Sequence, residues 1–162
     1  MQNTINNLLQ DIIAEAKTLN IPIGNIDPIV TINTRATKRL GQCSKRGEKY
    51  YIQISSFIIT EDKKALKETL AHEVLHTAKD CMNHGNIWKR YAYMMNRKYG
   101  YNITRTKDVA CYGIINPIIK TANYIIKCEK CGQTIYRQRQ SKLITHTHLY
   151  RCGKCKGKLV LM

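Results

Sequence analysis

A chain of 162 residues with 43% hydrophobic residues can bury one core, so we expect a compact domain with room for a small appendage. No apolar run approaches the roughly 18 residues of a membrane-spanning helix, and the first residues lack a signal-peptide pattern, which predicts a soluble protein that is not exported. Seven cysteines, an odd number in a chain without an export signal, favour thiolate metal binding over disulfides.

The formal net charge of +16 at pH 7 is unevenly distributed along the chain. Residues 61–80 have a net charge of −1, whereas residues 31–60 and 81–116 have +5 each and residues 117–162 have +9. This excess of cations predicts a polyanionic partner, nucleic acid first, that binds beside residues 61–80 rather than on them. A lysine-rich surface that serves only solubility is the alternative.

The first third of the chain predicts a helix followed by strands. Helical spacing relates the first hydrophobic residues, which are Ile5, Leu8, Leu9, Ile12, Ile13 and Ala16. Residues 26–33, with Pro28 near their start, predict one strand, and residues 39–57 predict two more around a turn at Arg46 and Gly47. We therefore expect a meander of about three strands.

Two further helices are predicted before the pattern weakens. Thr60 is a candidate N-cap for a helix that runs to about Lys79 and has acidic residues in its first turn. Asn86 is a candidate cap for the next helix, which Gly100 ends. The apolar stripe of that helix comprises Ile87, Trp88, Tyr91, Ala92 and Met95. A linker is expected near residues 113–122.

The stretch "HEVLH" is a candidate metal site. Residues four apart on a helix lie one turn above each other, so His72 and His76 converge on one ion while Glu73 flanks it. Catalytic zinc usually takes three protein ligands and keeps a position for water, and His84 is the natural third because Gly85 allows a sharp turn after it. The alternatives are a pair of ordinary core or surface histidines and, for His84, a polar turn residue.

These residue types in this pattern indicate metal-assisted hydrolysis. A zinc ion on three histidines lowers the pKa of its bound water toward about 7, and Glu73 is placed to take the proton before attack on a peptide carbonyl. The sequence does not identify the donor that stabilises the oxyanion. Tyr91 and Tyr93 are close in sequence, but we expect both to pack or to lie at the surface.

The C-terminal module contains two C-x-x-C pairs with 20 residues between them. Their members are Cys128, Cys131, Cys152 and Cys155. Two such pairs at this spacing predict a closed, structural four-cysteine zinc ribbon. A redox dithiol is the alternative, although a single pair would suffice for it. The remaining cysteines, Cys43, Cys81 and Cys111, are expected to be free buried thiols.

The same module is strongly basic. Residues 117–162 contain ten Lys and Arg against one acid, Glu129. Tyr136 and Tyr150 are candidates for stacking on bases. Candidate nucleic-acid contacts along the chain are Lys89, Arg90, Arg137, Arg139, Lys142 and Arg151.

Together these motifs resemble the SprT-like family, which includes bacterial SprT proteins and the eukaryotic protease Spartan. The resemblance rests on "HEVLH", on "HGNIW" with its aromatic residue three positions after the glycine, and on the basic "CEKCG…CGKC" pattern that ends in "LVLM". It spans most of the chain.

The resemblance implies an α+β fold. Residues 1–116 would form a zincin-like metallopeptidase domain, with helices packed on a small sheet and an HExxH active-site helix, and residues 117–162 a β zinc ribbon. It also implies a catalytic Zn²⁺ on His72, His76 and His84, Glu73 as the base, and a second, structural Zn²⁺ on the four cysteines.

The eukaryotic branch of the family cleaves proteins crosslinked to DNA in a DNA-dependent reaction. We accordingly expect DNA, single- or double-stranded, and DNA-bound proteins as partners, with low peptidase activity in the absence of DNA. No membrane partner is expected. We also expect a monomer located in the cytoplasm at the nucleoid.

Two other functions stay open. One is a zinc-ribbon protein that binds nucleic acid and has an inactive histidine site, although Glu73 argues against it because a structural site has no use for a proton acceptor. The other is a peptidase with a dedicated soluble substrate. Salt-sensitive DNA binding would count against the latter, since phosphate contacts weaken steeply with salt.

Overall fold

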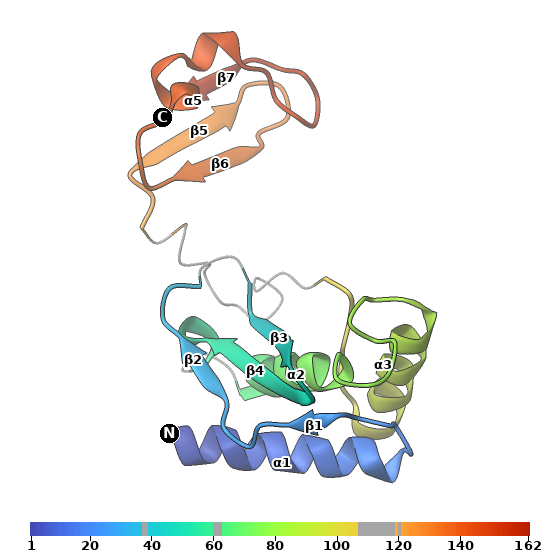
Figure 1. Cartoon of the computed structure of the whole chain (residues 1–162). Helices are drawn as coiled ribbons and strands as arrows, with labels where there is room; N and C mark the ends of the chain where they lie inside the picture. Colours follow the sequence, from blue (N-terminus) through green and yellow to red (C-terminus); the bar gives the residue numbers. More distant parts are fainter. Residues whose placement is uncertain (37–38, 60–62, 107–118, 120) are drawn as a thin grey trace. The chain divides into compact units, whose positions relative to one another are not determined.

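The computed structural model describes residues 1–36, 39–59, 63–106, 119 and 121–162 (Figure 1). The chain has mixed α/β structure and divides into two compact units, Met1–Ile114 and Ile115–Met162. The boundary expected after residue 116 and most of the expected linker lie outside the described residues, as do Cys111 and the expected cap Thr60. In the part of the chain that is described, no helix is long and apolar enough to cross a membrane.

A small sheet forms one side of the first unit. Its strands are β1 (Asn25–Ile26), β2 (Thr31–Asn33), β3 (Gly41–Arg46) and β4 (Lys49–Ser55). β3 and β4 form the expected antiparallel hairpin, with Gly47 at a φ of 56° in its turn. β1 and β2 instead pair with β4 in parallel, so the sheet is mixed and not the simple meander that we expected.

The strand predicted over residues 26–33 is interrupted by a turn. The Asp27 carboxylate accepts a hydrogen bond from the Ile29 N–H at 2.9 Å, and Pro28 between them has no N–H to offer a sheet. The chain therefore leaves β4 after Ile26 and returns to it at Thr31.

The helices of this unit are α1 (Gln2–Thr18), α2 (Lys63–Leu75) and α3 (Asn86–Tyr99), with a 3₁₀ turn at Ser56–Ile58. α2 is the central element, because it contacts α1, α3, β3 and β4 (Figure 1). Side chains of α1, α2, α3 and β4 form one core, with members that include Leu9, Ile12, Ile52, Ile54, Leu70, Val74, Trp88 and Met95. The burial of α2 on several sides holds its last turn in a fixed position.

Two helix ends differ from the predictions, and both affect the histidines. α2 ends at Leu75 and not near Lys79, because the Thr77 hydroxyl donates to the Val74 carbonyl at 2.7 Å and its own carbonyl accepts the Gly24 N–H at 3.1 Å. His76 thus lies just beyond the helix. Gly85 occupies the N-cap position of α3, so Asn86 is its first helical residue and not its cap.

The second unit is a small antiparallel sheet with short helical turns. Its strands are β5 (Tyr124–Cys128), β6 (Thr134–Arg137) and β7 (Leu159–Leu161), in the order β6-β5-β7. α5 (Lys142–Thr145) and a 3₁₀ turn at Thr147–Leu149 lie between β6 and β7 in the chain. Among the residues of this unit that the structure describes, the buried ones are Ile126, Cys128, Ile144, Cys152 and Leu159. Two of these five are cysteines, so the apolar core of this unit is very small.

Candidate metal centre and active site

Three histidines from different parts of the chain meet at one point. His72 lies in the last turn of α2, His76 in the turn after it, and His84 in the loop before α3. The Nε2 atom of His72 is 3.2 Å from Nε2 of His76 and 3.0 Å from Nε2 of His84. The structure therefore brings together all three histidines singled out in the sequence.

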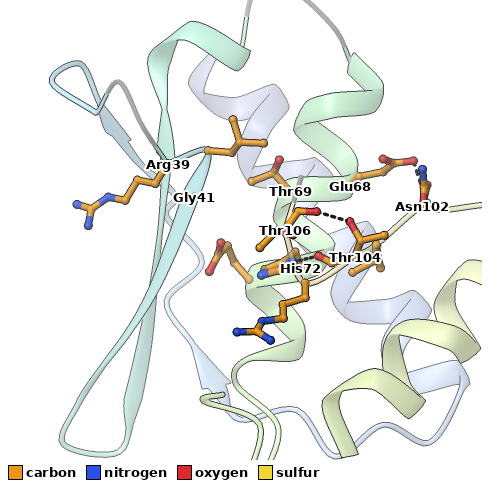
Figure 2. Close-up of a pocket in the computed structure, with 12 residues that line it drawn as sticks. Arg39, Gly41, Glu68, Thr69, His72, Asn102, Thr104 and Thr106 are labelled. Carbon is orange, nitrogen blue, oxygen red and sulfur yellow. Dashed lines mark hydrogen bonds between the residues drawn. The ribbon is translucent and has the colours of Figure 1, made fainter. Parts of the chain in front are cut away.

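Backbone carbonyls define the tautomers of two of these imidazoles. Nδ1 of His72 lies 3.1 Å from the Thr104 carbonyl oxygen (Figure 2), and Nδ1 of His76 lies 2.6 Å from that of Cys81. A carbonyl only accepts, so in both rings Nδ1 carries the hydrogen and donates it. The Nε2 atoms of His72 and His76 consequently face each other as unprotonated lone pairs.

This arrangement fits a metal ion. Two lone pairs 3.2 Å apart repel each other unless a cation lies between them. A tetrahedral zinc ion with Zn–N bonds of about 2.0–2.1 Å holds its nitrogen ligands about 3.3 Å apart, close to both distances seen here. A metal-bound histidine also usually donates its other ring N–H to an acceptor such as a backbone carbonyl, as Nδ1 does here.

The electrostatics of the cluster favour neutral imidazoles, which is the form that binds metals. Burial, followed by the proximity of His76 and His84, lowers the pKa of His72 to about 3. Burial also lowers the pKa of His76 and of His84, and for His84 the charges of His76 and Arg105 act in the same direction. Protons therefore compete weakly for these nitrogens at neutral pH.

The only tryptophan of the chain, Trp88, packs against all three histidine rings. The Trp88 ring centroid is 4.8 Å from that of His72, 5.6 Å from His76 and 4.6 Å from His84, and its side chain is buried. We predicted Trp88 as part of an apolar stripe, and it is buried as expected. Its contact with all three rings was not apparent from the sequence.

Glu73 lies beside the histidines in a buried position. Glu73 is only 6% exposed, and burial raises the pKa of its carboxyl group to about 8, against the smaller opposing effects of the Cys43 backbone N–H and the Arg39 charge. Gly41 comes so close that a Cβ atom there would be 2.7 Å from the Glu73 Oε1 atom. The edge strand β3 thus holds the carboxylate in place through its backbone.

Glu73 and His72 line the same pocket, which has a volume of about 320 Å³ (Figure 2). α2 contributes Glu68 and Thr69 to its wall, and the chain after α3 contributes residues 102–106. Gly41 at the start of β3 and the two residues before it, Arg39 and Leu40, complete the wall. A cleft of this size, next to a cluster that can hold a metal ion, has room for part of a polypeptide.

A comparison with known families identifies the family of the chain. The model of the SprT-like family matches residues 20–107, more than half of the chain and the whole of the histidine site. The chain belongs to the SprT-like family. This confirms the resemblance inferred from the motifs.

Individual relatives agree with this assignment. The chain is 48% identical over 44 residues to the protein SprT-like of Lactococcus lactis subsp. lactis (strain IL1403), a match to 27% of each chain. It is 52% identical over 40 residues to the protein SprT-like of Staphylococcus carnosus (strain TM300), covering 25% of this chain and 24% of that one. It is also 28% identical over 144 residues to human germ cell nuclear acidic protein, covering 80% of this chain. The matches thus span about a quarter of the bacterial relatives and 19% of the human protein.

The second unit of this SprT-like family member brings the four predicted cysteines together. The Sγ atoms of Cys128 and Cys155 are 3.5 Å apart, and those of Cys131 and Cys152 are 3.6 Å apart. Zn–S bonds of about 2.3 Å place the sulfurs of a tetrahedral site about 3.8 Å apart, so the cluster is of a size that can hold such an ion. The backbone N–H groups of Cys155 and Lys154 lower the pKa of Cys152 to about 6, which favours the thiolate that binds metals.

The predicted free thiols have different environments. Cys81 is buried, and its carbonyl is the partner of His76. Cys43 is half-buried, and burial together with the charge of Glu73 raises the pKa of its thiol to about 12. Cys81 therefore contributes to the site through its backbone carbonyl and not through its thiol.

The six predicted nucleic-acid contacts are exposed in the structure but lie in two units. Lys89 and Arg90 are on α3. The other four are in the second unit, where Arg137 is the last residue of β6, Arg139 lies two residues beyond it, Lys142 is the first residue of α5 and Arg151 lies beside Cys152. Arg151 donates hydrogen bonds to the carbonyls of His148 and Tyr150. Solvent exposure leaves these cations accessible to a polyanion.

Proposed function

We propose that this SprT-like protein is a zinc-dependent metallopeptidase of the HExxH type, with a zincin-like domain over residues 1–116 and a zinc ribbon over residues 117–162. One observation carries the proposal. The unprotonated Nε2 atoms of His72 and His76 converge with His84 at 3.0–3.2 Å, and a buried carboxylate, Glu73, lines the same pocket. A structural metal site has no need of that carboxylate.

In this proposal each residue has a defined task. His72, His76 and His84 hold the catalytic zinc, and Cys128, Cys131, Cys152 and Cys155 hold the structural one. The zinc ion, when bound, supplies a Lewis acid for the substrate carbonyl and for the attacking water. The positive charge of a zinc ion on the histidines would favour the ionised form of Glu73, whose carboxylate would accept a proton from the water and then donate it to the leaving amine.

We infer that the substrates are proteins bound or crosslinked to DNA. The net charge of +16 supports a polyanionic partner, as does the exposure of basic residues in both units. Tyr136 and Tyr150 accompany the arginines of the second unit, and such aromatic residues stack on exposed bases. We further propose a monomer that acts in the cytoplasm, at the nucleoid, and depends on DNA for efficient cleavage.

The test compares zinc-loaded wild type with Glu73→Gln on a DNA-binding protein as substrate, with and without single-stranded DNA. The same substitution at Glu48, an exposed residue of the β3–β4 turn, is the matched control. We expect DNA to stimulate cleavage by the wild type and by Glu48→Gln. Glu73→Gln should lose about 10²–10⁴-fold in rate while DNA binding is retained, because only the proton acceptor is removed.

Two outcomes would contradict the proposal in different ways. Equal inactivity of wild type and Glu73→Gln, with DNA bound by both, would indicate a nucleic-acid-binding protein without catalysis. Rapid cleavage of casein by the wild type, unaffected by DNA or by salt, would indicate a peptidase whose substrate is not DNA-associated.

A further inference from the structure

The segment that follows α3 connects the pocket to the metal centre. We call residues 101–106 the strap. Residues 102–106 line the pocket, and the Thr104 carbonyl is the partner of Nδ1 of His72 (Figure 2). The strap is neither helix nor strand, and no strand pairing with the described sheet holds it. Its position must come from other contacts.

Side chains of two helices provide those contacts. The Asn96 side chain on α3 donates from Nδ2 to the Ile103 carbonyl at 3.0 Å, and its Oδ1 accepts the Ile103 N–H at 2.8 Å. One amide side chain thus satisfies both backbone groups of Ile103, as a neighbouring strand would. The Glu68 carboxylate on α2 accepts the Asn102 N–H at 2.9 Å (Figure 2).

The two hydrogen bonds between Asn96 and Ile103 lie one residue before Thr104, whose carbonyl bonds His72. Ile103 is 4% exposed, so both its side chain and its backbone are held. With Ile103 fixed, the peptide that follows it has little freedom, and the Thr104 oxygen stays directed at His72. His76 has no such device, because its carbonyl partner, Cys81, lies in the turn immediately after it.

We propose that Asn96 is a positioning residue of the metal centre, which holds the strap so that the Thr104 carbonyl fixes the tautomer and the ring orientation of His72. This inference rests on the metal site of the proposed function but not on peptidase activity. Loss of a side chain or carbonyl that hydrogen-bonds a metal ligand typically lowers metal affinity about 10–100-fold. Asn96 does not bond His72 itself but acts on it through the strap. We therefore expect Asn96→Ala to lower metal affinity by about tenfold, the lower end of that range.

The first measurement is the tautomer of His72 in the metal-free chain of 162 residues, read from the ¹⁵N shifts of the ring nitrogens. Wild type should show the hydrogen on Nδ1 in both His72 and His76. In Asn96→Ala, His72 should become a mixture of tautomers while His76, held by Cys81, stays unchanged and serves as the internal control. A merely structural role for Asn96 would move both rings together or neither.

The second measurement is the affinity of the histidine site for Co²⁺, with the fluorescence of Trp88 as the reporter. Trp88 is the sole tryptophan and touches all three imidazoles, so its quenching reports this site and not the cysteine cluster. Asn96→Ala should bind Co²⁺ about tenfold more weakly than wild type. Arg97→Ala, an exposed change at the next position of α3, should match wild type.

Asn96→Asp keeps the comparison available if Asn96→Ala does not fold. The aspartate retains the oxygen that accepts the Ile103 N–H, but it loses the N–H that donates to the Ile103 carbonyl. His72 should therefore become a mixture of tautomers in Asn96→Asp, as in Asn96→Ala. Folded variants with wild-type tautomers and Co²⁺ affinity within twofold of wild type would overturn the inference. If wild type itself showed no quenching by Co²⁺, the proposed metal centre would fail, and the tautomer shift would still decide the role of Asn96.

Discussion

Replacing Gly41 with alanine should impair catalysis without removing a single catalytic group. The added Cβ would lie 2.7 Å from Oε1 of Glu73 and 2.9 Å from its Cγ, and also 2.9 Å from Cγ2 of Thr69. Carbon and oxygen atoms in ordinary contact are about 3.5 Å apart, so the carboxylate must move by about 0.8 Å. Gly41 has no unusual backbone conformation, and crowding of Glu73 is therefore the main effect.

The expected loss in cleavage rate follows from the displacement of the Glu73 carboxylate. A misplacement of about 1 Å in a catalytic group costs roughly 10²-fold in rate, equivalent to about 2.7 kcal/mol of transition-state stabilisation. Crowding in a packed region also lowers the free energy of unfolding by about 1–3 kcal/mol. The three atoms nearest to the new methyl group belong to Glu73 and Thr69 and none to a histidine, so metal affinity, read from Trp88 fluorescence with Co²⁺, should stay within about twofold of wild type.

The assay compares cleavage rate, Co²⁺ affinity and urea unfolding for wild type, Gly41→Ala and Gly47→Ala. Gly47 lies in the same hairpin, at a φ of 56° with no atom within 4 Å of the place that a methyl group would take, so alanine there strains the backbone by about 1–2 kcal/mol and touches nothing. Cleavage should fall only in Gly41→Ala. Equal rates in the two variants at similar stability would refute the argument that Gly41 makes room for Glu73.

Three further predictions concern metal and charge. Removal of zinc by EDTA should abolish the NMR dispersion of Ile126 and Ile144 while Ile52 and Ile54 keep theirs, since two of the five buried residues of the second unit are cysteines; persistence of all four signals would contradict this. Gly157→Ala should reduce bound zinc from two ions to one per chain by metal analysis, because its Cβ would lie 2.9 Å from the Cys128 sulfur, and an unchanged stoichiometry would exclude that crowding. The hydrogen bond from Lys49 lowers the pKa of Asp27 below 3.8, so its contribution to stability is present above about pH 4 and is lost as the pH falls through the folded pKa. Asp27→Asn should therefore lower the free energy of unfolding at pH 7 but not at pH 2, and an equal loss at both would show that the ion pair is not the cause.

Elements with a local signal were predictable, and those that depend on distant pairing were not. The amphipathic α1, the β3–β4 hairpin with Gly47 in its turn and the end of α3 at Gly100 all follow from periodicity and glycine chemistry within a few residues. The parallel pairing of β1 and β2 with β4 was missed, because the partner strands are about 20 residues apart in the chain. The early end of α2 was missed for the same reason, since Gly24 binds the chain after that helix.

The sequence by itself identified the side chains that make up the two candidate metal sites. Helical periodicity alone places His72 and His76 one turn apart, and the two C-x-x-C pairs define four thiolates, because both spacings are properties of local backbone geometry. Only the tertiary structure decided how those groups are used. The carbonyls of Thr104 and Cys81 choose the tautomers, and Gly41 makes room for Glu73. Backbone groups are the same in every residue, so no sequence pattern marks which of them the fold will bring to the site.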